Sequence, residues 1–339
     1  MTDNLADGRK RPSIYDVAAL AGVSHMTVSR VLNGAPSIRP DTRERVQAAI
    51  EEIRYRPSGP ARTLATRRTM RIGALVHSPS EYGPKSTVLS LERAARGAGY
   101  AIAAFSHSGA PGEVEEGISQ LDEQGVDGLC VIGPPAESPA TLGEVAERIP
   151  VVVVGSGGSD RLIHVDADQA GGAKLAVEHL LALGHRSILH LAGPLDGAVG
   201  AAREAAARRA VEDAGASLRT VLGDWSSASG FEVGADRARV GDATAIFAGN
   251  DEMALGVIHG LSTRGLEVPR DVSVVGFDDM PGSAHFMPPL TTVRQDFERI
   301  GEAVLGQILL ALDDRPARSI SLPTELIVRA STSRVAPPV

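Results

Sequence analysis

Four polar or aromatic residues in the second half of this sequence are of types that bind a hydroxyl-rich ligand. A carboxylate accepts hydrogen bonds, a guanidinium donates them and an amide does both, so Asp278, Arg203 and Asn250 together could bind several hydroxyls of one ring. Trp225, the only tryptophan in the chain, offers an apolar face for the C–H side of that ring. Because Asn250 and Asp278 each follow a short aliphatic segment, we expect them at neighbouring strand ends.

Each of these residues also has an ordinary structural explanation. Asn250 or the adjacent Asp251 could cap a helix, Arg203 could form an ion pair with an acid, and Trp225 could belong to a core. Taken singly, these explanations are at least as good as ligand binding. Taken jointly, the four residues favour a ligand site.

Other kinds of chemistry have little support in the sequence. The single cysteine, Cys130, forms no internal disulfide or cysteine cluster, and no Walker loop, dinucleotide fingerprint or Gly-x-Ser-x-Gly elbow is present. Asp278 and Asp279 lack a recognisable partner for acid–base catalysis. The histidines nearest one another lack the helical spacing of a zinc pair; they are His179, His185 and His190. We therefore predict no enzymatic activity, no cofactor and no metal.

Length and charge indicate a two-part protein. The chain has 339 residues, which is too long for one ordinary hydrophobic core. Its net charge is −8. Residues 1–69 hold 12 Lys and Arg against 7 Asp and Glu, whereas the remainder holds 22 against 35. A basic head on an acidic body suits nucleic-acid binding, although a solvated basic terminus would look the same. The absence of a signal segment or a long apolar run predicts a cytoplasmic protein with no membrane partner.

The basic region has the pattern of a helix-turn-helix. After a polar tail over residues 1–12, Ser13 is placed to cap a helix over 14–21, with an apolar stripe at Val17, Leu20 and Ala21. Gly22 supplies the turn to a second helix over 25–33. A third helix is expected from about residue 40 to 53, beginning at a proline.

The outer face of the second helix has residues suited to DNA. His25 and Met26 lie at its start, where a recognition helix contacts base edges, and Arg30 follows one turn later. Small hydroxyls that suit phosphate oxygens surround them at Ser24, Thr27 and Ser29. These features favour DNA binding over an ordinary three-helix bundle.

The stretch IYDVAALAGVSHMTVSRVLN, followed by TRERVQAAIEEIRYRP, resembles the DNA-binding head of the LacI/GalR family of bacterial repressors. The resemblance implies DNA contacts from these residues: Tyr15, Ser24, His25, Met26, Thr27, Ser29, Arg30, Asn33 and Thr42. In the family, a segment matching residues 58–69 forms a hinge helix on DNA and inserts leucines into the minor groove. Leu64 matches that leucine, with Ala61 beside it. The Ser-Gly-Pro that opens this segment departs from the family's common Asn-Ala.

Beyond residue 70, aliphatic segments alternate with helical stretches. Strands are expected near 71–76, 101–105, 128–132, 151–154, 188–191, 245–247 and 272–276, with a link near 163–165. Such alternation predicts two doubly wound parallel-sheet lobes, as in periplasmic binding proteins, with a ligand between them. The predicted domains are thus a tail over 1–12, a helix-turn-helix domain over 13–57, a hinge over 58–69 and a two-lobed core over 70–339.

The resemblance continues from about Ile14 to Thr332 and implies an effector site in the core. By position, the implied effector-binding residues are Pro84, Arg203, Trp225, Asn250, Asp278, Gln295 and Phe297. Three departures bear on the ligand. Gly155 stands where a sugar-binding member of the family has an aspartate, and Ile132 replaces a polar residue nearby. Ala206 and Ala207 stand where the family usually has a glycine followed by an aromatic residue. A sugar or galactoside-like glycoside remains the expected class.

The sequence as a whole predicts a DNA-binding transcriptional regulator, most simply a repressor that binds a palindromic operator as a homodimer under control of a small-molecule effector. The C-terminal tail, 331–339, has no leucine heptad, so a tetramer is not expected. Two alternatives stay open: a sugar-binding transport protein, and an α/β enzyme acting on sugars. The head over residues 13–68 argues against the first, and the missing phosphate loop and nucleophile argue against the second.

Overall fold

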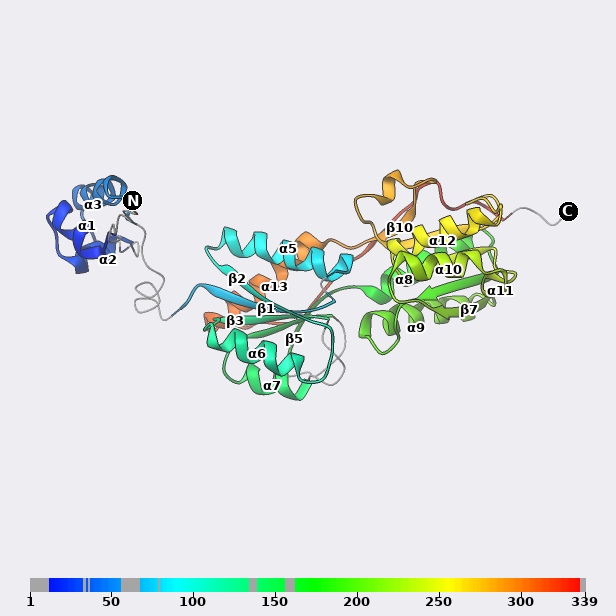
Figure 1. The fold of residues 1–339 in the computed structure, drawn as a ribbon, viewed down its shortest axis with the longest axis horizontal. Helices are drawn as coiled ribbons and strands as arrows, with labels where there is room; N and C mark the ends of the chain where they lie inside the picture. Colours follow the sequence, from blue (N-terminus) through cyan, green and yellow to red (C-terminus); the bar gives the residue numbers. More distant parts are fainter. Residues whose placement is uncertain are drawn as a thin grey trace, which may run out of the picture. The chain divides into compact units, whose positions relative to one another are not determined.

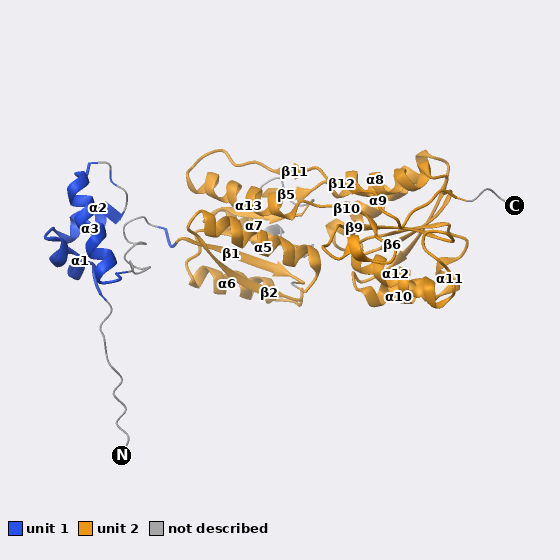
Figure 2. Cartoon of the chain, turned by 90° about the horizontal axis from the view of Figure 1, so that it is seen from above, with its two compact units in different colours: residues 1–69 blue, residues 70–339 orange. Residues whose placement is uncertain are grey.

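The computed structural model describes residues 12–32, 35, 37–55, 68–78, 80–133, 139–155 and 162–335. The chain divides into two compact units, residues 1–69 and residues 70–339 (Figure 2). Asn33 and the hinge residues Ala61 and Leu64 lie outside the described residues, so their predicted DNA contacts stay predictions.

Three helices make up the described part of the first unit: α1 (Ile14–Ala21), α2 (His25–Leu32) and α3 (Pro40–Glu52). Ser13 caps α1 as expected, in a capping box in which the Asp16 carboxylate accepts from the Ser13 backbone N–H at 2.7 Å. Gly22 ends α1 in the left-handed conformation, at φ 63°, and lets the chain turn into α2.

The apolar core of this unit lies where the three helices meet. Val17 and Ala21 of α1 are buried there together with Val28 and Val46. Leu20 was expected in the same stripe but is 46% exposed, and Ala18 is buried instead. The reason is that α1 packs against both α2 and α3, which turns the face containing residues 17, 18 and 21 inward.

The second unit contains two lobes, each built on a six-stranded sheet (Figure 1). The first sheet is parallel, in the order β11-β5-β4-β3-β1-β2. Its strands are β1 (Arg71–His77), β2 (Ala101–His107), β3 (Gly128–Ile132), β4 (Val151–Val154), β5 (Ile163–Ala167) and β11 (Ile320–Leu322). Helices α5 (Tyr82–Gly97) and α13 (Phe297–Leu312) share one apolar cluster with its strands, and α6 (Glu113–Glu123) and α7 (Pro139–Ala146) share the other.

The second lobe repeats this plan, in the order β12-β10-β9-β8-β6-β7, with only β12 antiparallel to its neighbour. Its strands are β6 (Ser187–Ala192), β7 (Ser217–Leu222), β8 (Ala245–Ala248), β9 (Ser273–Asp278), β10 (Thr291–Arg294) and β12 (Glu325–Ile327). Helices α8 (Gln169–Ala182) and α9 (Ala198–Asp213) cover one face. Helices α10 (Ser227–Ala235), α11 (Arg237–Val240) and α12 (Asp251–Thr263) cover the other.

The chain passes between the two lobes three times. It crosses after β5, returns between β10 and α13, and crosses again between β11 and β12. These crossings complete each sheet with strands from distant parts of the sequence. The predicted fold class, a helix-turn-helix head with two doubly wound lobes, is therefore confirmed.

Several short elements were not predicted. The segment 163–165 was expected as a link but forms β5, while β7, β10, β11 and β12 had no prediction. These strands contain or adjoin exposed polar residues, so their apolar runs are too short to read from the sequence. No helix in the described part of the chain is long and apolar enough to span a membrane.

Candidate DNA-reading helix and effector site

Helix α2 presents its start to solvent and its middle to the core. Thr27 N–H donates to the Ser24 hydroxyl at 3.1 Å, so Ser24 caps the helix. Met26 is 61% exposed and His25 is also exposed, whereas Val28 and Val31 are buried. A helix with polar and flexible side chains at an exposed N-terminus has the layout of a recognition helix.

The other predicted DNA contacts in the described part of the head come from all three helices, α1, α2 and α3. Tyr15 is 65% exposed, with its ring centroid 5.1 Å from that of His25. The Arg30 Nη2 group donates to the Ser37 hydroxyl at 2.6 Å, so its guanidinium holds the loop after α2 in this structure. Thr27, Ser29 and Thr42 are partly buried.

Arg203 on α9 is the centre of a buried polar network in the second lobe. Its guanidinium donates to Gln169 Oε1 from Nε at 2.9 Å and from Nη2 at 2.7 Å, and Nη1 donates to the carbonyl of Gly249. Nη2 also lies 3.7 Å from Asp278 Oδ1. The guanidinium carbon is 3.6 Å from the ring centroid of Phe277. Five contacts thus fix a charged group that is only 4% exposed.

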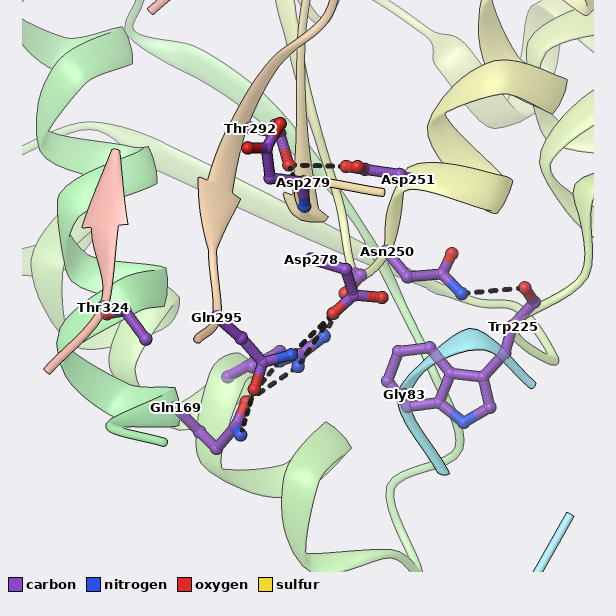
Figure 3. Close-up of polar contacts among 12 residues, drawn as sticks. Gly83, Gln169, Trp225, Asn250, Asp251, Asp278, Asp279, Thr292, Gln295 and Thr324 are labelled. Carbon is purple, nitrogen blue, oxygen red and sulfur yellow. Dashed lines mark hydrogen bonds and ion pairs between the residues drawn. The ribbon is translucent and has the colours of Figure 1, made fainter. Parts of the chain in front are cut away.

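Asp278 and Gln295 extend this network at the ends of neighbouring strands. The Gln295 amide donates to Asp278 Oδ1 at 2.6 Å, where β9 and β10 run side by side (Figure 3). Asp278 has φ 111°, an unusual backbone for a non-glycine residue. Strained backbone of this kind is common at ligand sites, where it directs a side chain.

Trp225 and Asn250 form a second contact beside the network. Asn250 Nδ2 donates to the Trp225 carbonyl at 2.9 Å, and Asn250 Oδ1 accepts from Met253 N–H at 2.8 Å (Figure 3). The cap at the start of α12 is therefore Asn250, one of the alternatives considered above. The Trp225 ring centroid is 5.7 Å from the guanidinium carbon of Arg203. A Cβ atom added at Gly193 would overlap the Trp225 ring, so a glycine is needed there.

Burial sets the protonation of the acids at these strand ends. Burial raises the pKa of Asp278 to about 6, although the charge of Arg203 and the Gln295 hydrogen bond favour the carboxylate. Burial and the nearby charge of Asp278 raise the pKa of Asp251 to about 7. Asp251 accepts from Thr292, Ser283 and the backbone N–H of Met280. Asp251 thus fastens the loop after β9, while Asp278 lies beside Arg203.

Pro84 and Phe297 belong to the first lobe and make no hydrogen bond with this network. Pro84 is in the first turn of α5, and the Phe297 ring at the start of α13 makes an edge contact with Tyr82 at 5.6 Å. Burial raises the pKa of Glu81, and the charges of Glu252 and Asp278 add to this shift. Acidic groups of the second lobe therefore act electrostatically on a carboxyl group at the start of α5.

Sequence reasoning missed Gln169 and Asp166, which complete the network. Gln169 Nε2 donates to Asp166 Oδ1 at 3.1 Å and to Gln295 Oε1 at 2.9 Å, and its Oε1 accepts twice from Arg203. The only sequence signal was position, since both residues lie where β5 ends and the chain crosses to α8. Gly155, at the end of β4 with φ 135°, has no side chain, and Ile132 is apolar and 3% exposed. Neither position therefore supplies a polar group.

Comparison with known proteins decides the family. Residues 13–58 match a model described as "Bacterial regulatory proteins, lacI family", and residues 177–332 match a periplasmic binding protein-like domain. The chain is 33% identical to the lactose operon repressor of Escherichia coli over 95% of its own length and 91% of that protein. The chain belongs to the LacI family of bacterial regulatory proteins. The resemblance seen in the sequence is thereby confirmed.

Other members of the LacI family agree. The chain is 35% identical to the transcriptional regulator CelR of Thermobifida fusca and 31% identical to the repressor PurR of Haemophilus influenzae, in each case over 95% of its own length and 99% of the relative. These relatives are transcriptional regulators, so the chain is a DNA-binding regulator and not an enzyme.

Solved structures of LacI-family proteins have the same fold. A lac repressor dimer bound to operator and the anti-inducer ONPF matches at TM-score 0.86 and 32% identity, covering 96% of this chain and all of that one. A complex of CelR with cellobiose matches at TM-score 0.72 and 31% identity, covering 95% of this chain and all of that one.

Proposed function

We propose that this LacI-family chain is a repressor that binds a near-palindromic operator as a homodimer in the cytoplasm, and that a sugar or glycoside bound between the lobes controls it. The observation that carries the effector proposal is the buried network of Arg203, Gln295 and Asp278 beside the half-buried ring of Trp225. A buried guanidinium next to a carboxylate and an aromatic ring suits a ring rich in hydroxyls.

The DNA-binding proposal depends on the exposed start of α2. One such helix reads only a few base pairs, so two copies are needed for a specific site, and the operator is then expected to repeat in inverted orientation. The operator-bound lac repressor dimer is the structural relative that supports this reading. In our proposal, Ala61 and Leu64 contribute minor-groove contacts when the hinge folds on DNA.

The relatives support a sugar effector. One related structure holds cellobiose, and the lactose operon repressor is among the relatives. Purines are a different class of ring compound and belong in the ligand panel as a contrast to sugars. Gly155 and Ile132 leave the first lobe without the polar groups that a sugar-binding member has there. A ligand held mainly by the second lobe therefore fits better than an exact copy of a galactoside site.

The mechanism we propose is a shift between two arrangements of the lobes. An effector that binds one arrangement more tightly increases its population, and DNA affinity changes by that differential affinity. Turnover of a bound sugar, or binding of sugar without any DNA preference, would instead support the enzyme or transport alternatives.

The test is an operator gel shift with a panel of galactosides, β-glucosides, other sugars and purines. We expect one sugar class to change operator affinity, and we expect Arg203→Ala to abolish that response. Arg209→Ala is the matched control, because Arg209 lies on the same helix and is exposed. An unchanged response in Arg203→Ala would show that the effector binds elsewhere.

A further inference from the structure

Two histidines lie together in the first lobe, at the ends of the adjacent strands β1 and β2. His77 and His107 are register partners in this parallel pair, so their side chains point to the same face of the sheet. That face is the one covered by α6 and α7, because Leu75 and Phe105, two residues earlier on each strand, belong to its apolar cluster. The pair is not part of the Arg203 network.

Three of the four ring nitrogens of this pair are buried and have no hydrogen-bond partner among the described residues. Among the described residues, nothing bonds to either ring nitrogen of His107 or to Nδ1 of His77. His107 is 4% exposed. A buried polar atom without a partner costs on the order of 1–3 kcal/mol, so three of them side by side call for an explanation.

The separation of the two rings suits a shared metal ion. Their centroids are 5.2 Å apart and their planes meet at 46°. A zinc–nitrogen bond of about 2.1 Å places each ring centroid about 3.2 Å from the metal, and a tetrahedral angle then separates two centroids by about 5.2 Å. Imidazole nitrogen is also a preferred ligand of Zn²⁺, and binding would give one unpartnered nitrogen on each ring a partner.

The surroundings favour a cation. The Glu113 carboxylate is held by the backbone N–H of Ser108 at 2.7 Å and by that of Ala110 at 3.2 Å. A carboxylate held in place by the segment directly after His107 therefore lies near the pair, where it favours a cation.

We propose that His77 and His107 bind one divalent transition-metal ion, with Zn²⁺ as the preferred ion and solvent completing its coordination. No cluster of three or more His, Cys, Asp or Glu occurs in the part of the chain that the structure describes, so the protein supplies two ligands here. The sequence alone predicted no metal, because the two histidines are thirty residues apart and only strand register brings them together.

The experiment is equilibrium dialysis of the full, untagged chain against Zn²⁺ at pH 7.5, followed by Co²⁺ substitution and visible spectroscopy. We expect one saturable equivalent of Zn²⁺ per chain, and affinity at least about tenfold weaker in His77→Gln and in His107→Gln. His285→Gln is the matched control, because His285 is exposed and distant in sequence. It should bind Zn²⁺ like the wild type.

A thermal melt separates metal loss from misfolding. Zn²⁺ should raise the Tm of the wild type and of His285→Gln but not that of either pair variant, because only a ligand of the native state stabilises it. Co²⁺ should give a d–d absorption spectrum with nitrogen ligands that disappears in the same two variants. No saturable binding by the wild type, or binding that survives the double substitution, overturns the proposal.

Discussion

Replacing Gln169 with alanine tests whether the proposed effector site depends on this residue. Gln169 bonds to Arg203 and Gln295 and lies directly after the first crossing between the lobes. Gln169 accepts two hydrogen bonds from Arg203 and donates one to Gln295, and all three side chains are buried. A hydrogen bond to a charged group contributes about 1.5–3 kcal/mol, and here the truncation leaves guanidinium donors buried without an acceptor. We therefore expect Gln169→Ala to lower the free energy of unfolding of the second unit by about 3 kcal/mol.

Urea unfolding and a thermal melt of the same variant measure its loss of stability, and effector titration measures its loss of affinity. At about 2–4 °C per kcal/mol, Tm should fall by roughly 6–12 °C, and effector affinity should fall about tenfold or more because Arg203 is no longer held in place. Gln120→Ala is the control, because the exposed Gln120 amide donates to Glu116 one turn earlier on the same helix. This substitution should change the free energy of unfolding by less than about 0.5 kcal/mol. If Gln169→Ala matched Gln120→Ala in both assays, the network would not position Arg203.

Three further outcomes are expected. The pKa of Asp251 is raised to about 7 from 3.8, so the native state holds this proton more tightly than the unfolded chain; the resulting stabilisation is present at low pH and is lost as pH rises from about 4 to 7. Relative to Asp251→Asn, the wild type should lose on the order of 2–4 kcal/mol across that range in urea unfolding, and parallel pH profiles would contradict the assignment. Ser13→Ala removes the capping box of α1 and should cost about 1 kcal/mol, measured as faster amide exchange in α1 of the full chain while α12 is unchanged. Leu64→Gly should weaken specific operator binding far more than non-specific binding in gel shifts, and equal losses would argue against a minor-groove role.

The sequence was enough to predict the fold class because its strongest patterns are local. The strand over 128–132 has no polar residue except one cysteine and the strand over 151–154 is four valines, and both appear with the predicted bounds. Strands β11 and β12 are three residues each, and they exist only because distant segments pair with them. Tertiary pairing of this kind leaves no periodic signal in the sequence.

The candidate site was predictable only in part, for a related reason. Arg203, Asp278 and Gln295 were expected to lie together, and the structure brings them into one network. Gln169 was not expected, although it joins Arg203 to Gln295, because a glutamine at the start of a helix has no distinctive pattern. Its role follows from the crossing of the chain. The crossing places Gln169 Nε2 at 2.9 Å from Oε1 of Gln295, a residue 126 positions further along the sequence.

The position of Gln169 suggests how a ligand could be linked to lobe movement. Gln169 follows the first crossing between the lobes and Gln295 lies in the second, so their hydrogen bond joins two of the three segments that connect the lobes. The third crossing is tied to the first where the Thr324 hydroxyl donates to the Asp168 carbonyl at 3.4 Å. In the proposed mechanism, a ligand that draws Arg203 toward itself would act on Gln169 and, through Gln169, on the crossings. Coupling requires such a shared element with two arrangements, and these crossings are where the structure provides one.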